Sequence, residues 1–91
     1  MNLLKESRTR INEIDNQLVK LFEERMHVVE NIARYKAENN LPVFDSSREK
    51  SNIEKNSAKL EDQNLKKYFQ EWYQCTMAVS KEYQKDILKR G

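Results

Sequence analysis

The sequence has almost none of the residues that end regular secondary structure. Its 91 residues include one glycine, Gly91 at the end of the chain, and one proline, Pro42. Sandwiches, barrels and doubly wound sheets depend on many tight turns, which glycine and proline largely supply. The scarcity of both residues argues against all-β and α/β folds. A composition rich in lysine, glutamate, leucine and glutamine instead favours long helices.

Disulfides, membrane spans and export signals are also missing from the sequence. The only cysteine, Cys75, cannot form an internal disulfide, and no apolar run approaches the roughly 20 residues of a membrane span. The segment MNLLKESRTR contains neither an apolar core of signal-peptide length nor a small-residue cleavage site. We therefore expect a cytoplasmic protein with no membrane partner, in which Cys75 is a free thiol.

The charge balance excludes another class of partner. The chain carries 17 basic and 15 acidic residues, a formal net charge of +2, and the two signs are interspersed. Because no basic stripe with stacking aromatic residues is present, the sequence does not indicate nucleic-acid binding.

Apolar residues recur every seven positions in the first part of the chain. Two rows, three positions apart, contain Leu4, Ile11, Leu18 and Ile32, and Ile14, Leu21, Val28 and Tyr35. This a/d pattern predicts one helix over residues 3–39, about 55 Å long at 1.5 Å per residue. The roughly 50 remaining residues are too few to cover such a helix. We therefore expect a second copy of the chain to pack against it.

Two further helices are predicted after a loop at residues 40–45, where Pro42 disfavours helical geometry. The second helix starts near Ser46, which has capping-box spacing to Glu49, and ends near Lys59 to Asp62. The third helix covers about residues 64–89 and has two inward-facing stripes. One consists of Leu65, Phe69, Trp72, Thr76, Val79 and Tyr83, and the other of Tyr73, Met77, Ser80, Gln84 and Ile87. The predicted fold is all-α, a single domain over residues 1–91. Its long, short and long helices are expected to be completed by a partner chain.

Arg25 interrupts the first apolar row, between Leu18 and Ile32. A buried guanidinium requires an anion. Lys36 lies 11 residues further on, within about 20° of the same face and roughly 16 Å along the axis, so the two cations can converge. Arg8 is about 25 Å from Arg25 along the helix and cannot share a small pocket with it in one chain. A partner helix that crosses antiparallel could bring its own Arg8 close.

Each of these polar residues also has a simpler interpretation. Arg25 could set the register of a coiled coil, and Arg8 and Lys36 could be solvated surface residues. Glu49 could serve only as a capping residue, with Arg48 on the surface of the same turn. Ser80 and Gln84, which lie one turn apart, could form a small polar patch in a helix interface.

No motif for a cofactor, a metal ion or a catalytic nucleophile is present. The sequence has no glycine-rich phosphate loop, no metal-ligand spacing and no Ser-His-Asp or Cys-His arrangement. We therefore expect no cofactor and no metal. Any chemistry would depend on positioning and charge.

The polar residues nevertheless form a connected pattern with the apolar rows. The pattern consists of Arg8-x-x-Ile11-x-x-Ile14-Asp15, Leu18, Leu21 and Arg25, Ile32-Ala33-x-x-Lys36, Pro42-Val43-x-Asp45-x-x-Arg48-Glu49, and Ser80-x-x-x-Gln84. It resembles the all-helical chorismate mutases over about residues 4–84, and its most specific part is the Asp-x-x-Arg-Glu element. The resemblance implies an intertwined homodimer of three-helix chains with two active sites. It also implies an isomerase of the shikimate pathway that converts chorismate to prephenate for aromatic amino acid biosynthesis.

The resemblance also implies roles for individual residues. Arg25 and the partner's Arg8 would bind the two carboxylates of chorismate, with help from Ser80. Lys36 and Gln84 would donate to the ether oxygen of the substrate. At the ring hydroxyl, the implied acceptor is Glu49, and the residues that line the same corner are Asp45 and Arg48. A Claisen rearrangement is unimolecular and requires no nucleophile, metal or cofactor, which agrees with the motifs that are missing.

Two alternatives remain open from the sequence. An isochorismate-pyruvate lyase resembles the same scaffold and acts on a related dianion, although the Asp45, Arg48 and Glu49 element favours the mutase. A non-catalytic helical dimerisation module would use Arg25 and Gln84 only to set the register of the helices.

Overall fold

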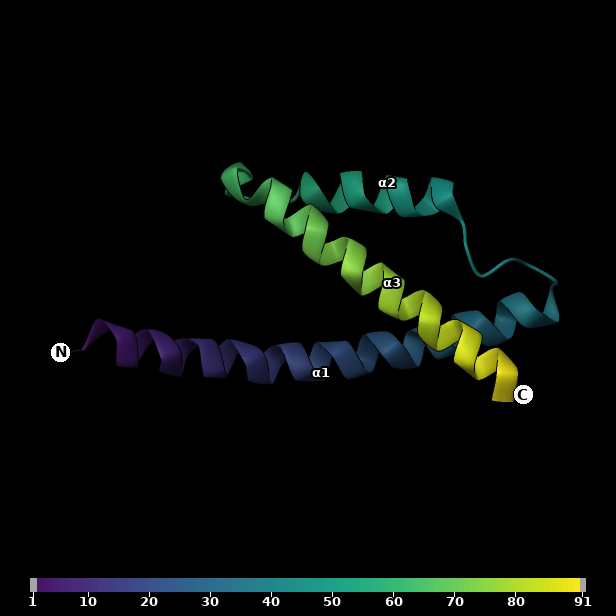
Figure 1. Ribbon diagram of the computed structural model, residues 1–91, viewed down its shortest axis with the longest axis horizontal. Helices are drawn as coiled ribbons and strands as arrows, with labels where there is room; N and C mark the ends of the chain where they lie inside the picture. Colours follow the sequence, from purple (N-terminus) through teal and green to yellow (C-terminus); the bar gives the residue numbers. More distant parts are fainter. Residues whose placement is uncertain (1, 91) are drawn as a thin grey trace.

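The computed structural model describes residues 2–90, which form three α-helices and one short 3-10 helix (Figure 1). Helix α1 spans Leu3–Glu38, α2 spans Ser46–Ser57, η1 spans Gln63–Leu65 and α3 spans Lys66–Arg90. No strand occurs within these residues, so the prediction of an all-helical chain with long, short and long helices is confirmed. No helix in the same range is both long enough and apolar enough to cross a membrane.

Asparagine residues flank helix α1 at both ends. The Asn2 side chain caps the first turn by accepting a hydrogen bond from the Lys5 backbone N–H at 3.2 Å. After Glu38 the chain leaves the helix through Asn40, whose φ of 55° lies in the left-handed region that asparagine tolerates better than most residues. Pro42 follows two residues later, and together these residues account for the end of the helix close to its predicted position.

Helix α2 starts at Ser46, as predicted, but its capping residue differs from the prediction. Its N-cap is Asp45, not Ser46, and the Asp45 carboxylate accepts from the Arg48 backbone N–H at 3.1 Å. Adjacent aspartate and serine residues both favour this position, and the carboxylate holds it here. The predicted capping box between Ser46 and Glu49 is therefore wrong, and the Glu49 side chain is not used to close the helix end.

The end of α2 also comes earlier than predicted. The helix stops at Ser57, before the expected Lys59 to Asp62. The Gln63 side chain donates to the backbone carbonyls of Ser57 and Leu60 at 3.1 and 2.6 Å, which satisfies acceptors released at the helix end. Asp62 then caps η1, so the expected start of the third helix near residue 64 lies in this 3-10 turn.

The helices pack unevenly along α1. In Figure 1, α3 crosses the C-terminal half of α1, and α2 lies beside α3 on the other side from α1, while the N-terminal half of α1 extends away from both. The buried apolar residues are Val29 and Ala33 of α1 and Met77 and Ile87 of α3. The core within one chain is therefore small and lies where α1 and α3 cross.

The two predicted apolar rows of α1 do not form this core. All eight residues of the rows are exposed, from 39% at Ile14 to 61% at Tyr35. In α3, the stripe that contains Met77, Ser80 and Gln84 is buried, whereas Trp72 and Val79 of the other stripe are exposed. One chain thus buries one face of each long helix and leaves a second, apolar face exposed.

Candidate active site

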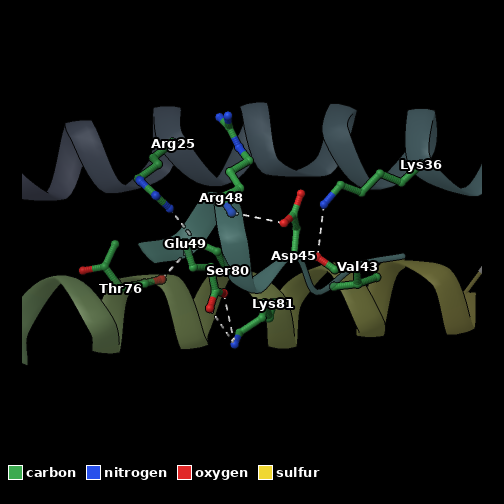
Figure 2. A network of polar contacts seen from close by, with 9 residues as sticks. All are labelled: Arg25, Lys36, Val43, Asp45, Arg48, Glu49, Thr76, Ser80 and Lys81. Atoms are coloured by element: carbon green, nitrogen blue, oxygen red, sulfur yellow. Dashed lines mark hydrogen bonds and ion pairs between the residues drawn. The ribbon is translucent and has the colours of Figure 1, made fainter. Parts of the chain in front are cut away.

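A pocket of about 130 Å³ lies between α1, α2, α3 and the loop that joins α1 to α2. Figure 2 shows side chains from all three helices directed into this region. The pocket is lined by Arg25, Val29, Ile32, Lys36, Val43, Asp45, Arg48, Glu49, Asn52, Met77, Ser80, Lys81 and Gln84.

Arg25 reaches the pocket from the middle of α1. Its Nη1 donates a hydrogen bond to Ser80 Oγ of α3 at 2.5 Å, and Ser80 in turn donates to the Thr76 backbone carbonyl at 3.0 Å (Figure 2). The guanidinium carbon of Arg25 also lies 6.0 Å from the centre of the Tyr73 ring. A guanidinium has five N–H donors, so this arrangement fixes Arg25 and leaves most of its donors for an anion.

Lys36 joins the end of α1 to the loop. Its Nζ donates to the Val43 backbone carbonyl at 3.0 Å, which directs the ammonium across the pocket (Figure 2). An ammonium has three N–H donors, so two are left to a ligand. Arg25, Ile32 and Lys36, which the sequence interpretation placed together, all line the pocket.

The first turn of α2 contributes three charged residues. Asp45 caps the helix, Arg48 extends its side chain toward α1, and Glu49 faces α3 (Figure 2). Glu49 forms an ion pair with Lys81 of α3, with 3.0 Å between Lys81 Nζ and Glu49 Oε1. The Lys81 ammonium also lies 4.4 Å from the centre of the Phe44 ring. The loop, α2 and α3 are therefore connected through polar contacts at this edge of the pocket.

Gln84 is the most unusual polar residue of the pocket. Its side chain is buried, and within residues 2–90 its Oε1 atom has no hydrogen-bond partner. A buried, unpaired amide oxygen costs free energy, about 1–3 kcal/mol in general, unless a ligand or another chain provides the partner. A half turn about the last side-chain bond exchanges Oε1 with the Nε2 donor, so the carboxamide can offer either group at this position.

The pocket has an excess of positive charge. Its lining includes four cations, Arg25, Lys36, Arg48 and Lys81, and two carboxylates, Asp45 and Glu49, for a net charge of +2. Apolar side chains from α1 and α3 form the remaining wall. Within residues 2–90, no group of three or more histidine, cysteine, aspartate or glutamate residues is arranged to hold a metal ion. The guanidinium, ammonium and amide donors that line the pocket are suited to bind a small anion.

Seven of the eight predicted site residues lie around this one pocket. They are Arg25, Lys36, Asp45, Arg48, Glu49, Ser80 and Gln84. Arg8 is exposed near the start of α1 and is not among the lining residues, as its distance along the helix requires. Lys81 is a lining residue that the sequence interpretation missed. Its sequence signal was weak, because it lies on a helix that also carries several surface lysines.

A second hollow of about 190 Å³ adjoins the pocket and is mainly apolar. Its lining residues are Phe22, Arg25, Met26, Trp72, Cys75, Thr76, Val79 and Ser80. Cys75 is an exposed free thiol in this hollow. Arg25 and Ser80 line both cavities and so separate them.

Together, the fold and the pocket define a class of small all-helical domain in which helix-borne cations surround a site for a small anion. The family described as chorismate mutase type II matches residues 7–85. The chain belongs to this family.

Two relatives in Buchnera aphidicola are each named as a bifunctional chorismate mutase/prephenate dehydratase. The protein from subsp. Acyrthosiphon pisum (strain APS) is 38% identical over 84 residues, which cover 91% of this chain and 22% of that protein. The protein from subsp. Schizaphis graminum (strain Sg) is 36% identical over 84 residues, with the same coverage of 91% and 22%. The chain therefore spans about a fifth of the length of the curated relatives it matches.

Proposed function

We propose that residues 1–91 act as a single chorismate mutase domain that converts chorismate to prephenate for phenylalanine and tyrosine biosynthesis. The observation that carries this proposal is the pocket of net charge +2 that holds Arg25, Lys36, Glu49 and Gln84 in a member of this family. Chorismate is a small dianion, so its charge is complementary to that of the pocket. The reaction is intramolecular and requires no group beyond donors and acceptors of the kinds present.

Binding would restrict chorismate to the compact conformer from which the rearrangement starts. Arg25 is suited to grip one carboxylate, because its guanidinium is oriented by Ser80 and retains unpaired donors. Glu49 would accept the hydrogen bond from the ring hydroxyl, while Asp45 and Arg48 line the same corner. Holding the two reacting carbons close together removes part of the entropic barrier.

The chemical step breaks the ether C–O bond as the new C–C bond forms, with no transfer of a proton. Negative charge develops on the ether oxygen as that bond lengthens. Donors fixed at this oxygen stabilise the transition state more than the ground state. We assign this role to the free N–H groups of Lys36 and to the amide of Gln84, rotated so that Nε2 faces the oxygen.

The proposed assembly is an intertwined homodimer in which each site receives Arg8 from the partner chain. The uncovered apolar rows of α1 and the exposed Trp72 and Val79 of α3 support a second chain as their cover. The apolar hollow supports the same arrangement, because a side chain that enters it from outside would approach Arg25 and Ser80. The partner's Arg8 would then bind the second carboxylate of the substrate.

The direct test is to incubate the purified chain with chorismate and follow the loss of its ultraviolet absorbance, with NMR identification of the product. We expect prephenate as the product. A parallel incubation with isochorismate tests the lyase alternative, for which release of pyruvate would be the positive result. A chain that leaves chorismate unchanged while remaining folded would refute the proposal and favour a dimerisation module.

The oligomeric state requires its own measurement. Light scattering coupled to size-exclusion chromatography should give a mass of two chains. A monomer that is active at all concentrations would refute the shared site.

A further inference from the structure

Lys81 lies at the edge of the pocket and contacts both neighbouring elements. Its Nζ is 3.0 Å from Oε1 and 3.4 Å from Oε2 of Glu49, so one ammonium engages both oxygens of the carboxylate. The same Nζ lies 4.4 Å from the centre of the Phe44 ring, in the loop just before α2. Figure 2 shows the ammonium of Lys81, on α3, next to the carboxylate of Glu49, on α2.

The burial of this ion pair distinguishes it from an ordinary surface pair. The Lys81 and Glu49 side chains are only 28% and 24% exposed. By contrast, the Arg10–Glu13 pair near the start of α1 has side chains that are 66% and 57% exposed. Pairs of the exposed kind usually contribute little, because solvent screens them and their side chains remain mobile. Lys81 is held by an anion on one side and an aromatic face on the other, which restricts where the Glu49 carboxylate can point.

Lys81 also sets the charge of the pocket. Without it, three cations would face two carboxylates, and the net charge would fall from +2 to +1. The carboxylate of Glu49 would then be less compensated and would repel an incoming dianion more strongly. The ion pair therefore allows an acceptor carboxylate to be present in a site that binds an anion.

We propose that Lys81 is a positioning residue that holds the Glu49 carboxylate in the orientation needed to accept the ring hydroxyl of the substrate. This inference rests on the proposed function. Lys81 acts through Glu49, and the second oxygen of that carboxylate, with its longer contact to Nζ, is the one more available to the substrate.

The test compares chorismate turnover in the full chain and in four variants. Lys81→Met keeps the length of the side chain and removes its charge, Lys81→Arg keeps the charge, and Lys81→Gln is a second neutral variant in case the first fails to fold. Lys85→Met is the matched control, because Lys85 lies one turn further along α3 and is exposed. Thermal melting and chain mass should be the same for all variants that are compared.

We expect Lys81→Met and Lys81→Gln to lower kcat/KM about tenfold, since charge-assisted contacts of partly buried groups have effects of this order. Lys81→Arg should remain within about threefold of the parent, and Lys85→Met should equal it. The decisive comparison uses Glu49→Gln as the background. If Lys81 acts through Glu49, adding Lys81→Met to Glu49→Gln should lower kcat/KM less than about twofold.

The possible failures are distinguishable. A folded parent chain that does not convert chorismate would refute the proposed function and this inference with it. An active parent with an equally active Lys81→Met variant would refute the inference alone. A tenfold loss that persists in the Glu49→Gln background would mean that Lys81 acts on the substrate directly, and the positioning role would be wrong.

Discussion

Arg25 of α1 donates a hydrogen bond to the Ser80 hydroxyl of α3, and that hydroxyl donates a hydrogen bond to the Thr76 backbone carbonyl. Ser80 has a single O–H, so its donor is occupied and its oxygen serves as the acceptor for Arg25. In the proposed site, Ser80 would therefore help to bind a carboxylate by orienting Arg25. Direct donation from Ser80 to a carboxylate would require the contact with Thr76 to break.

Replacing Arg25 with methionine tests whether this residue serves chemistry or stability. An arginine in an aliphatic row stabilises a helix interface no better than a hydrophobic residue of similar size. We expect Arg25→Met to keep or raise the melting temperature and to lower chorismate turnover at least a hundredfold, since a charged partner of the substrate is lost. Arg34→Met, an exposed change on the same helix, is the control. Normal turnover in a folded Arg25→Met chain would contradict the assignment.

Replacing Gln84 with glutamate should make activity depend on pH. An ionised carboxylate has no donor and repels charge that develops on the ether oxygen, whereas a protonated carboxyl can donate. Burial disfavours the ionised form, so the new side chain should gain its proton at mildly acidic pH. The turnover of Gln84→Glu should therefore rise as pH falls from about 8 to 5, while that of the parent changes less. A variant with the pH profile of the parent would mean that Gln84 does not contact the ether oxygen.

Mixed dimers test the origin of Arg8. The Arg8→Ala and Arg25→Ala chains should each be nearly inactive as homodimers. A mixed dimer has one site that combines an intact Arg25 from one chain with an intact Arg8 from the other, and a second site that lacks both. With random association about half of the dimers are mixed, so co-expression should restore roughly a quarter of all sites.

Differently tagged chains allow the mixed dimers to be isolated before chorismate turnover is measured. Each parent homodimer, carried through the same purification, provides the baseline. If isolated mixed dimers recover no activity, the shared site is wrong, and Arg8 is a surface residue or acts within its own chain.

Two substitutions separate the capping role of Asp45 from its charge. Asp45→Asn keeps a side-chain acceptor for the Arg48 backbone N–H, whereas Asp45→Ala removes it. Loss of a cap typically costs about 1 kcal/mol, so Asp45→Ala should lower the free energy of unfolding by about this amount and Asp45→Asn by less. Urea unfolding at a fixed chain concentration measures the difference. Equal stability of the two variants would contradict the capping role.

The Glu30–Arg34 pair gives a prediction about pH that is independent of the site. The hydrogen bond from Arg34, at 2.7 Å, holds the pKa of the Glu30 carboxyl below its ordinary value. A depressed pKa means that the pair's contribution to stability is present above the ordinary carboxyl range and is lost as pH falls through the lowered value. NMR titration should show a higher Glu30 pKa in Arg34→Gln than in the parent. Identical titration curves would contradict the contact.

The helices were predictable because their causes are local. A seven-residue apolar repeat without a breaker before Asn39 defines α1, and Pro42 defines the loop that follows. The start of α2 at Ser46 was predicted correctly, but its capping residue was not, because Asp45 and Ser46 are both good caps and sequence spacing alone cannot choose between them. The early end of α2 depends on Gln63, whose side chain folds back onto carbonyl groups after the helix.

Burial and the full composition of the pocket were harder to predict because they depend on how the helices cross. The regular rows of α1 are exposed in one chain, while Val29 and Ala33, which lie outside those rows, are buried. Lys81 was missed for the same reason. Its partner Glu49 is 32 positions away in sequence, so only the packing of α2 on α3 brings the two charges together.

Three local features restrict the loop between α1 and α2 within six residues. Asn40 adopts a left-handed turn, Val43 accepts the hydrogen bond from Lys36, and Asp45 closes the first turn of α2. Little conformational freedom therefore remains in the loop whose Val43 carbonyl holds the Lys36 ammonium. The entropy of ordering these groups is therefore lost when the chain folds and not when a ligand arrives. Affinity would then depend partly on the conformation of residues outside the pocket, and loosening the turn at Asn40 would weaken binding without altering any residue that lines the pocket.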